Sequence, residues 1–142
     1  MKKIIHWHNG QCFVTGVNPS RSHAIEEIAK RVVPDGADFL LLEESEVPEL
    51  LWQEAFEKGN GGVAVNMPKA RECARKEIRR LRAPMFPHLD AEWMKATGQK
   101  NVLAADAIDA KRQRLRDAPQ DPRIEAAQTT DELKALIGDC LQ

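Results

Sequence analysis

The sequence predicts an α+β protein with a small N-terminal ββαβ module, an α-helical hairpin module and a short C-terminal helix. Three observations lead to this prediction. Short apolar runs separated by turn residues occupy the first part of the chain, apolar residues recur every three or four positions between 67 and 117, and prolines divide that helical pattern. At 142 residues the chain has the length of one domain or two small modules. We place the boundary so that the modules are 1–58 and 59–142.

The first module begins with a predicted β-hairpin. Lys3–Trp7 and Gln11–Val17 read as short strands around Asn9-Gly10, a dipeptide that supplies the positive φ angles of a two-residue turn. A helix is expected from about His23 to Val32, capped by Ser20 or Ser22.

The module ends with a short apolar run. Asp38–Glu43 is bounded by turn residues, which favours a buried strand. We further expect a short helical stretch over Glu49–Glu57, a flexible turn over Gly59–Gly62, and an edge strand at Val63–Val65 added to the first module.

Three helices are predicted in the second module. Met67–Arg82 is the first, with a proline in its first turn and Ala83-Pro84 after its end. The second spans Phe86–Thr97 and ends at Gly98, where we expect a left-handed C-cap. The third spans about Asn101–Asp117 and has arginines in its last turn.

The C-terminal helix has a clear start signal. Thr129 followed three positions later by Glu132 forms a capping box, which predicts a helix from Thr130 to about Ile137, ended by Gly138.

Charge is strongly segregated although the net charge is only −1. Eight acids against one lysine give 35–58 a net charge of −7, and seven cations against two acids give 69–82 a net charge of +5. Either the two segments partly neutralise each other within the fold, or the basic helix is left open for an acidic partner.

Several classes of protein are not expected. No secretory signal and no apolar run near the ~18 residues of a membrane span are present, so we expect a soluble protein made in a cytoplasm, without membrane contact. The three cysteines are odd in number and widely spaced, which argues against a disulfide framework or a zinc site. No serine-hydrolase elbow, phosphate-binding loop, dinucleotide fingerprint or metalloprotease helix occurs, so we expect no enzyme and no cofactor.

Two alternatives remain open. His6 and His8 are two apart on a strand and so project to the same side, and with Cys12, His23 or a carboxylate they would form the site of a small metal-dependent hydrolase. The basic helix 69–82 would instead bind nucleic acid, although no aromatic residue is interleaved with its arginines to stack on bases.

A series of phrases resembles the small tail proteins of tailed bacteriophages, which are encoded near tail tip or fibre genes and some of which are described as tail assembly chaperones. The phrases, in chain order, are Val47-Pro48, Trp52–Glu57, Val65–Arg71, Ile78–Pro84, Leu89-Asp90 with Met94, and Lys111–Asp117. The chain departs from that pattern in two places: Leu50-Leu51-Trp52 stands where an acidic or arginine-containing phrase with an aromatic is usual, and Phe56 stands where tryptophan is common.

The resemblance implies a non-enzymatic protein that contacts phage tail or tail-fibre proteins, located in the virion tail or in the host cytoplasm during assembly; homo-oligomerisation stays open. Apolar and arginine side chains are the usual anchors of such interfaces. The expected apolar anchors are Leu50, Leu51, Trp52, Phe56 and Trp93, and the expected charged contacts are Arg75, Arg79 and Arg82.

Overall fold

The computed structural model describes residues 1–18 and 24–142, and these form two compact units, Met1–Ala70 and Arg71–Gln142. Strands lie in the first unit and most of the helical residues in the second, which confirms the α+β class. The division falls inside helix α2 (Met67–Arg82) rather than at 58/59. The cause is local, because Asn66 and Lys69 bind the Glu57 carboxylate and so tie the first turn of α2 to the N-terminal unit.

The N-terminal sheet has three antiparallel strands in the order β2-β1-β3: β1 (Lys2–His8), β2 (Gln11–Gly16) and β3 (Phe39–Glu43). Asn9 (φ 50°) and Gly10 (φ 74°) make the two-residue turn, as predicted. Such a turn fixes the register of the hairpin, here with His8 opposite Gln11. The predicted third strand is also confirmed, and it pairs with the central strand β1.

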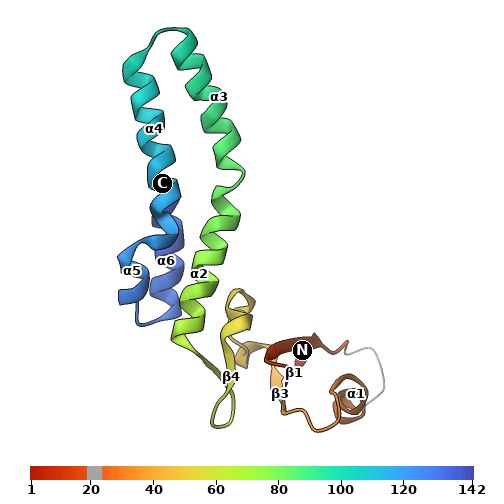
Figure 1. Ribbon diagram of the computed structural model, residues 1–142. Coiled ribbons are helices and arrows are strands. Elements are labelled where there is room, and N and C mark those ends of the chain that lie inside the picture. Colours follow the sequence, from red (N-terminus) through yellow and green to blue (C-terminus); the bar gives the residue numbers. More distant parts are fainter. Residues whose placement is uncertain (19–23) are drawn as a thin grey trace. The chain divides into compact units, whose positions relative to one another are not determined.

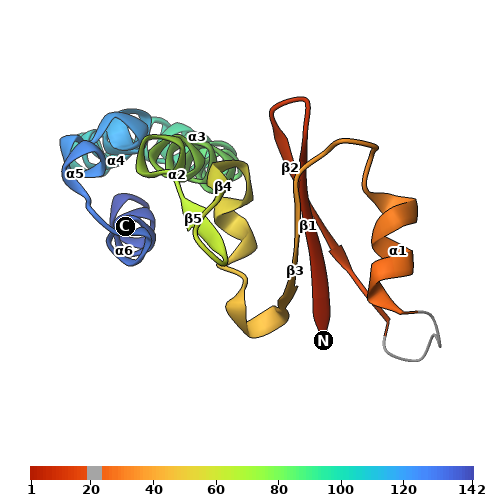
Figure 2. The same ribbon diagram turned by 90° about the horizontal axis from the view of Figure 1, so that it is seen from below.

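Different elements pack on the two faces of this sheet. Helix α1 (Ile25–Val32) lies on one side and the 3₁₀ helix η2 (Leu50–Ala55) on the other, as Figure 2 shows. On the η2 side, Trp7 Nε1 donates to Phe56 O at 2.9 Å and Gln53 Nε2 donates to Cys12 O at 2.8 Å. The expected start of α1 at His23 and its expected caps Ser20 and Ser22 lie outside the described residues.

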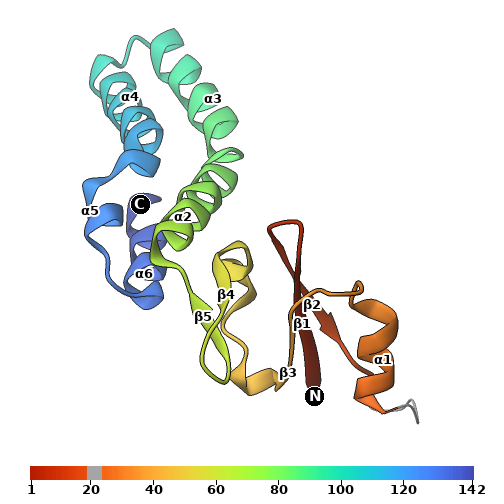
Figure 3. The ribbon, with the colours of Figure 1, turned by 60° about the horizontal axis from the view of Figure 1, so that its bottom comes forward.

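The short helical stretch expected over Glu49–Glu57 is confirmed as the 3₁₀ helix η2, and it is shorter than expected because the chain continues at Phe56 as strand β4 (Phe56–Lys58). The edge strand expected at Val63–Val65 does not join the three-stranded sheet. Strand β5 (Val63–Val65) pairs with β4 and not with the first sheet, and Figure 3 shows the two as a separate hairpin. The tight turn closed by Gly59 N donating to Gly62 O at 2.8 Å brings β5 back onto its nearest neighbour in sequence. A short 3₁₀ turn, η1 (Glu44–Glu46), precedes η2.

The second unit contains the predicted helical hairpin. Helices α3 (Met85–Gly98) and α4 (Val102–Asp117) run side by side in opposite directions, with α2 leading into α3 (Figure 1). Helix α3 ends at Gly98, as predicted, but Gly98 does not take the expected left-handed conformation, which Lys100 (φ 55°) takes instead. Asn101 then caps α4, since its side chain accepts from Ala104 N at 3.1 Å.

Three short helices complete the unit: η3 (Ala118–Gln120), α5 (Pro122–Ala126) and α6 (Thr130–Cys140). Thr129 caps α6 as predicted, but α6 continues through Gly138 to Cys140, because glycine lowers helix stability without forcing an end. Ile78, Leu115, Ile124 and Leu133 are almost fully buried and form the centre of the core. Within 1–18 and 24–142, no helix is long and apolar enough to cross a bilayer.

Candidate protein-binding surfaces

The arginines of α2 mostly serve the helical unit itself. Arg71, Arg75 and Arg82, spaced four and seven apart, donate to backbone carbonyls at the C-terminal ends of α4, η3 and α5. Carbonyls at the end of a helix have no N–H partner within that helix. An arginine there donates the missing hydrogen bond, and its positive charge interacts favourably with the negative end of the helix dipole. We call these three residues the arginine clamp. Its bonds are Arg71 Nη2 to Ala127 O (2.8 Å), Arg75 Nε to Pro119 O (3.2 Å), and Arg82 Nη1 to Leu115 O (2.6 Å) and Arg116 O (2.8 Å).

Further contacts hold the clamp in place. Arg75 also binds the carboxylates of Glu72 and Glu125, and hydrogen bonding from Arg75 lowers the pKa of Glu125. Arg82 stacks over the Phe86 ring, with its guanidinium carbon 5.9 Å from the ring centre. Two of the three arginines expected to contact a partner are therefore engaged within the unit, which also leaves fewer cations for phosphate contacts.

Arg79 differs from the clamp residues. It is exposed, and its side chain makes no ion pair or hydrogen bond with another described residue. Among the arginines of α2 expected to contact a partner, it is the one that the structure leaves available. The neighbouring Arg80 is bound by the Glu77 carboxylate, and this pairing lowers the pKa of Glu77.

The expected apolar anchors fall into two groups. Trp52 and Phe56 are each 2% exposed and lie in the core of the N-terminal unit, so they offer no surface to a partner. Trp93 is half-buried, and its Nε1 donates a hydrogen bond to Asp109 Oδ2 at 3.1 Å. The guanidinium carbon of Arg112 lies over its ring, 5.1 Å from the ring centre. Leu50 and the half-buried Leu51 remain at the surface of η2, with Leu50 56% exposed.

The histidine pair does not form a metal site with the described part of the chain. No group of three or more His, Cys, Asp or Glu side chains among residues 1–18 and 24–142 is placed to hold an ion, and His23 lies outside those residues. His6 is buried whereas His8 is exposed. Burial, and then the charge of His8, lower the pKa of His6, and burial raises the pKa of the Cys12 thiol to about 11.

An aromatic row crosses the face of the sheet opposite η2. His6 on the central strand stands opposite Phe13 on one side and Phe39 on the other, so all three side chains share one face. His6 stacks on Phe13 with 5.0 Å between ring centres and 13° between planes. Phe13 and Phe39 are 39% and 44% exposed. We refer to Phe13, His6 and Phe39 as the aromatic row.

The sequence analysis did not identify this surface, although the pairing of Phe13 with His6 could have been predicted from the sequence. The Asn9-Gly10 turn fixes the register that places Phe13 opposite His6. Phe39 comes from a strand that pairs at long range, and no local signal gives its register.

A second apolar surface lies at the end of the α3–α4 hairpin. Met94, Val102 and Leu103 are 68%, 66% and 84% exposed, although such side chains are usually buried. They lie within ten positions of one another, in the last turns of α3 and the first turn of α4. We call these three residues the hairpin tip.

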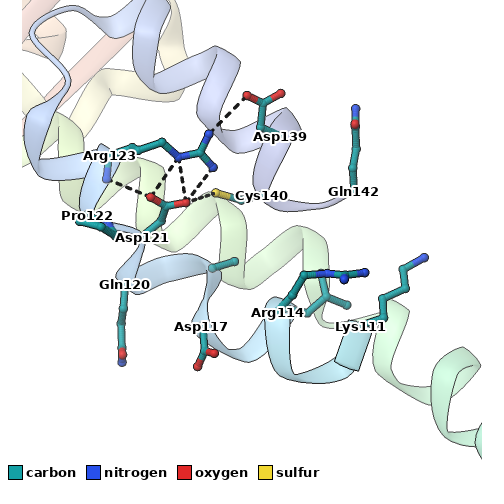
Figure 4. Close-up of a pocket in the computed structure, with 12 residues that line it drawn as sticks. Lys111, Arg114, Asp117, Gln120, Asp121, Pro122, Arg123, Asp139, Cys140 and Gln142 are labelled. Carbon is teal, nitrogen blue, oxygen red and sulfur yellow. Dashed lines mark hydrogen bonds and ion pairs between the residues drawn. The ribbon is translucent and has the colours of Figure 1, made fainter. Parts of the chain in front are cut away.

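A hollow of about 490 Å³ opens among the end of α4, η3, the start of α5 and the end of α6 (Figure 4). On one side, the Asp121 carboxylate accepts from the Arg123 guanidinium and backbone N–H, and Cys140 Sγ lies 3.6 Å from it. Arg123 also reaches Asp139 at 3.8 Å. Lys111 and Arg114 of α4 line the other side.

The electrostatics of this hollow do not favour nucleophilic chemistry. Hydrogen bonding from Arg123 lowers the pKa of Asp121 to about 2, so this carboxylate is a poor general base at neutral pH. Burial, followed by the nearby Asp121 charge, raises the pKa of Cys140. The thiol is therefore protonated at neutral pH, whereas a cysteine nucleophile acts as the thiolate.

A scan against models of protein families and searches of the curated proteins and of the solved structures found no match to this chain.

Proposed function

We propose that the chain is a non-enzymatic phage tail protein that acts through protein contacts, either as a structural component of the distal tail or tail fibre or as a factor in its assembly. The observation that carries this proposal is the aromatic row. Two partly exposed phenylalanines lie on one face of a sheet, and aromatic side chains of this kind anchor protein–protein interfaces.

The row is well suited to docking because its geometry is fixed before a partner arrives. Backbone pairing of β1 with β2 and β3 sets the spacing of the two rings, and stacking on His6 restrains Phe13. A preorganised surface loses little conformational entropy on binding. The lowered pKa of His6 keeps the imidazole between the rings neutral, so binding there does not require burial of a charge.

The phage context comes from the resemblance over about Val47–Leu136, which supports a location in the virion tail or, during assembly, in the host cytoplasm. Mass spectrometry of purified phage particles that encode the chain separates the two roles. A structural component is present in the particles, whereas an assembly factor is found only in the infected-cell lysate.

The role of the aromatic row is tested by affinity purification from infected cells. Tail or tail-fibre proteins should be recovered with the tagged chain, and recovery should be lost with the double variant Phe13→Ser and Phe39→Ser. The double variant Phe13→Tyr and Phe39→Tyr is the matched control, because it keeps both aromatic rings at the same positions of the sheet. If no tail protein is recovered with the wild type, the proposed function is wrong; if the serine variant recovers as much as the control, the row does not carry it.

A further inference from the structure

The end of the α3–α4 hairpin is held in a fixed shape. At the turn, Lys100 N donates to Thr97 O at 3.0 Å and Asn101 N to Ala96 O at 2.9 Å, and the Asn101 side chain caps α4. More than about two helical turns from this connection, Arg112 binds Asp90 across the hairpin at 2.6 Å. The exposed side chains of the hairpin tip therefore project from a rigid support and not from a loose loop.

Apolar exposure is concentrated at this end. Leu103 is 84% exposed, the highest value among the exposed large hydrophobic residues of the described chain, and Val102 is its neighbour. Met94 on α3 adds a third exposed apolar side chain. Exposed clusters of this kind, bordered by polar residues, mark interaction surfaces in soluble proteins.

The charges around the tip are balanced in sign. Glu92 and Asp106 are exposed acids, and Lys95 and Lys100 are exposed cations, all within fifteen positions of the chain. None of the four forms an ion pair or a side-chain hydrogen bond with another described residue. The border of the hairpin tip thus carries two unpaired charges of each sign and has no net charge.

We propose that the hairpin tip is an interface between two copies of this chain. In a two-fold symmetric contact the same surface patch of both copies meets. A charged border can therefore be complementary to the border of the other copy only when it carries both signs of charge. The balanced border meets that condition, with lysines of one copy facing acids of the other. If the partner were a different protein with a strongly charged surface, we would expect the border to carry only the opposite sign of charge.

In this contact the apolar side chains at the end of one hairpin cover those at the end of the other. This inference does not depend on the phage assignment, because self-association is a property of the isolated chain. Its failure would leave docking through the aromatic row unaffected.

The first test is the mass of the full-length protein in solution. Sedimentation equilibrium of the wild type should give a concentration-dependent dimer, at twice the chain mass of 16.0 kDa. Leu103→Glu should give a monomer with unchanged far-ultraviolet circular dichroism, because an exposed side chain does not support the fold. The matched control Leu50→Glu, at an exposed leucine of the other unit, should remain dimeric. A monomeric wild type, or a Leu103→Glu variant that dimerises like the control, overturns the proposal.

The second test uses the balanced charges. The double variant Lys95→Glu and Lys100→Glu places four acids on the border, and we expect the dimer dissociation constant to rise roughly tenfold or more, because like charges then face each other. Adding Glu92→Lys and Asp106→Lys restores the balance with the signs exchanged, and dimerisation should return. If the fourfold variant remains as weak as the double variant, the two copies do not meet through this border and the proposal fails. Capture of another protein by a wild type that stays monomeric would also overturn it.

Discussion

Replacing Arg82 by methionine should destabilise the helical unit strongly, although the side chain belongs to a helix whose composition suggests a solvated basic face. Arg82 donates to Leu115 O at 2.6 Å and Arg116 O at 2.8 Å, at the last turn of α4. Methionine keeps much of the aliphatic contact and removes both donors. The two carbonyls then lose their hydrogen-bond donor. Only the more exposed carbonyl, that of Arg116, can readily accept a hydrogen bond from water instead.

The size of the effect follows from these contacts. A hydrogen bond from a charged donor contributes about 1.5–3 kcal/mol, and the bond to the exposed Arg116 carbonyl lies at the low end because water replaces it. Loss of the guanidinium over Phe86, 5.9 Å from the ring centre, adds about 0.5 kcal/mol. We expect a total of about 4 kcal/mol, which corresponds to a fall in Tm of roughly 15–30 °C for a unit of this size.

Thermal unfolding followed by circular dichroism at 222 nm measures this effect, since most helical residues lie in the second unit. Arg79→Met is the matched control on the same helix, because Arg79 is exposed and has no side-chain partner among the described residues; it should change the free energy of unfolding by less than about 0.5 kcal/mol. Arg82→Lys should fall between the two, since an ammonium lacks the planar fork of donors. Equal destabilisation by Arg82→Met and Arg79→Met would refute the role of the arginine clamp.

Three further predictions concern single positions. Because the pKa of His6 is lowered in the folded state, the unfolded chain binds protons first as pH falls below 6.5, so stability of the N-terminal unit should decrease between pH 8 and 5 in urea titrations, and His6→Phe should flatten that dependence. The pKa of Asp121 is lowered from 3.8 to about 2, so its contribution of about 1–2 kcal/mol is complete above pH 4 and is lost as pH falls toward 2; Asp121→Asn should lower stability at pH 7 and remove that acid-induced loss. Gly10 has φ 74° and open space around its Cα, so Gly10→Ala should cost about 1 kcal/mol from backbone strain alone, measured by chemical denaturation, whereas a neutral effect would show that the turn relaxes to another type.

The sequence by itself determined the elements whose signals are local. Asn9-Gly10 requires positive φ at both positions, and this fixed the hairpin and its register. Proline at the start of α2 and the Thr129 cap of α6 act within one helical turn, so both helices start where the sequence predicts. Gly138 misled the prediction of a helix end, and Gly98 ends α3 without the expected left-handed cap, because glycine permits such a cap without requiring one.

Only the tertiary structure decided what the side chains of those elements contact. The periodicity of α2 places Arg71, Arg75 and Arg82 on one side, but their acceptors are carbonyls more than thirty positions away, at helix ends that the sequence does not bring together. The same holds for Phe39, whose place beside His6 depends on the pairing of β3 with β1. Local propensity acts over a few residues, whereas burial and the satisfaction of helix-end carbonyls depend on segments that meet only when the chain has folded. The arginines therefore read as a docking face in the sequence and serve as internal supports in the structure.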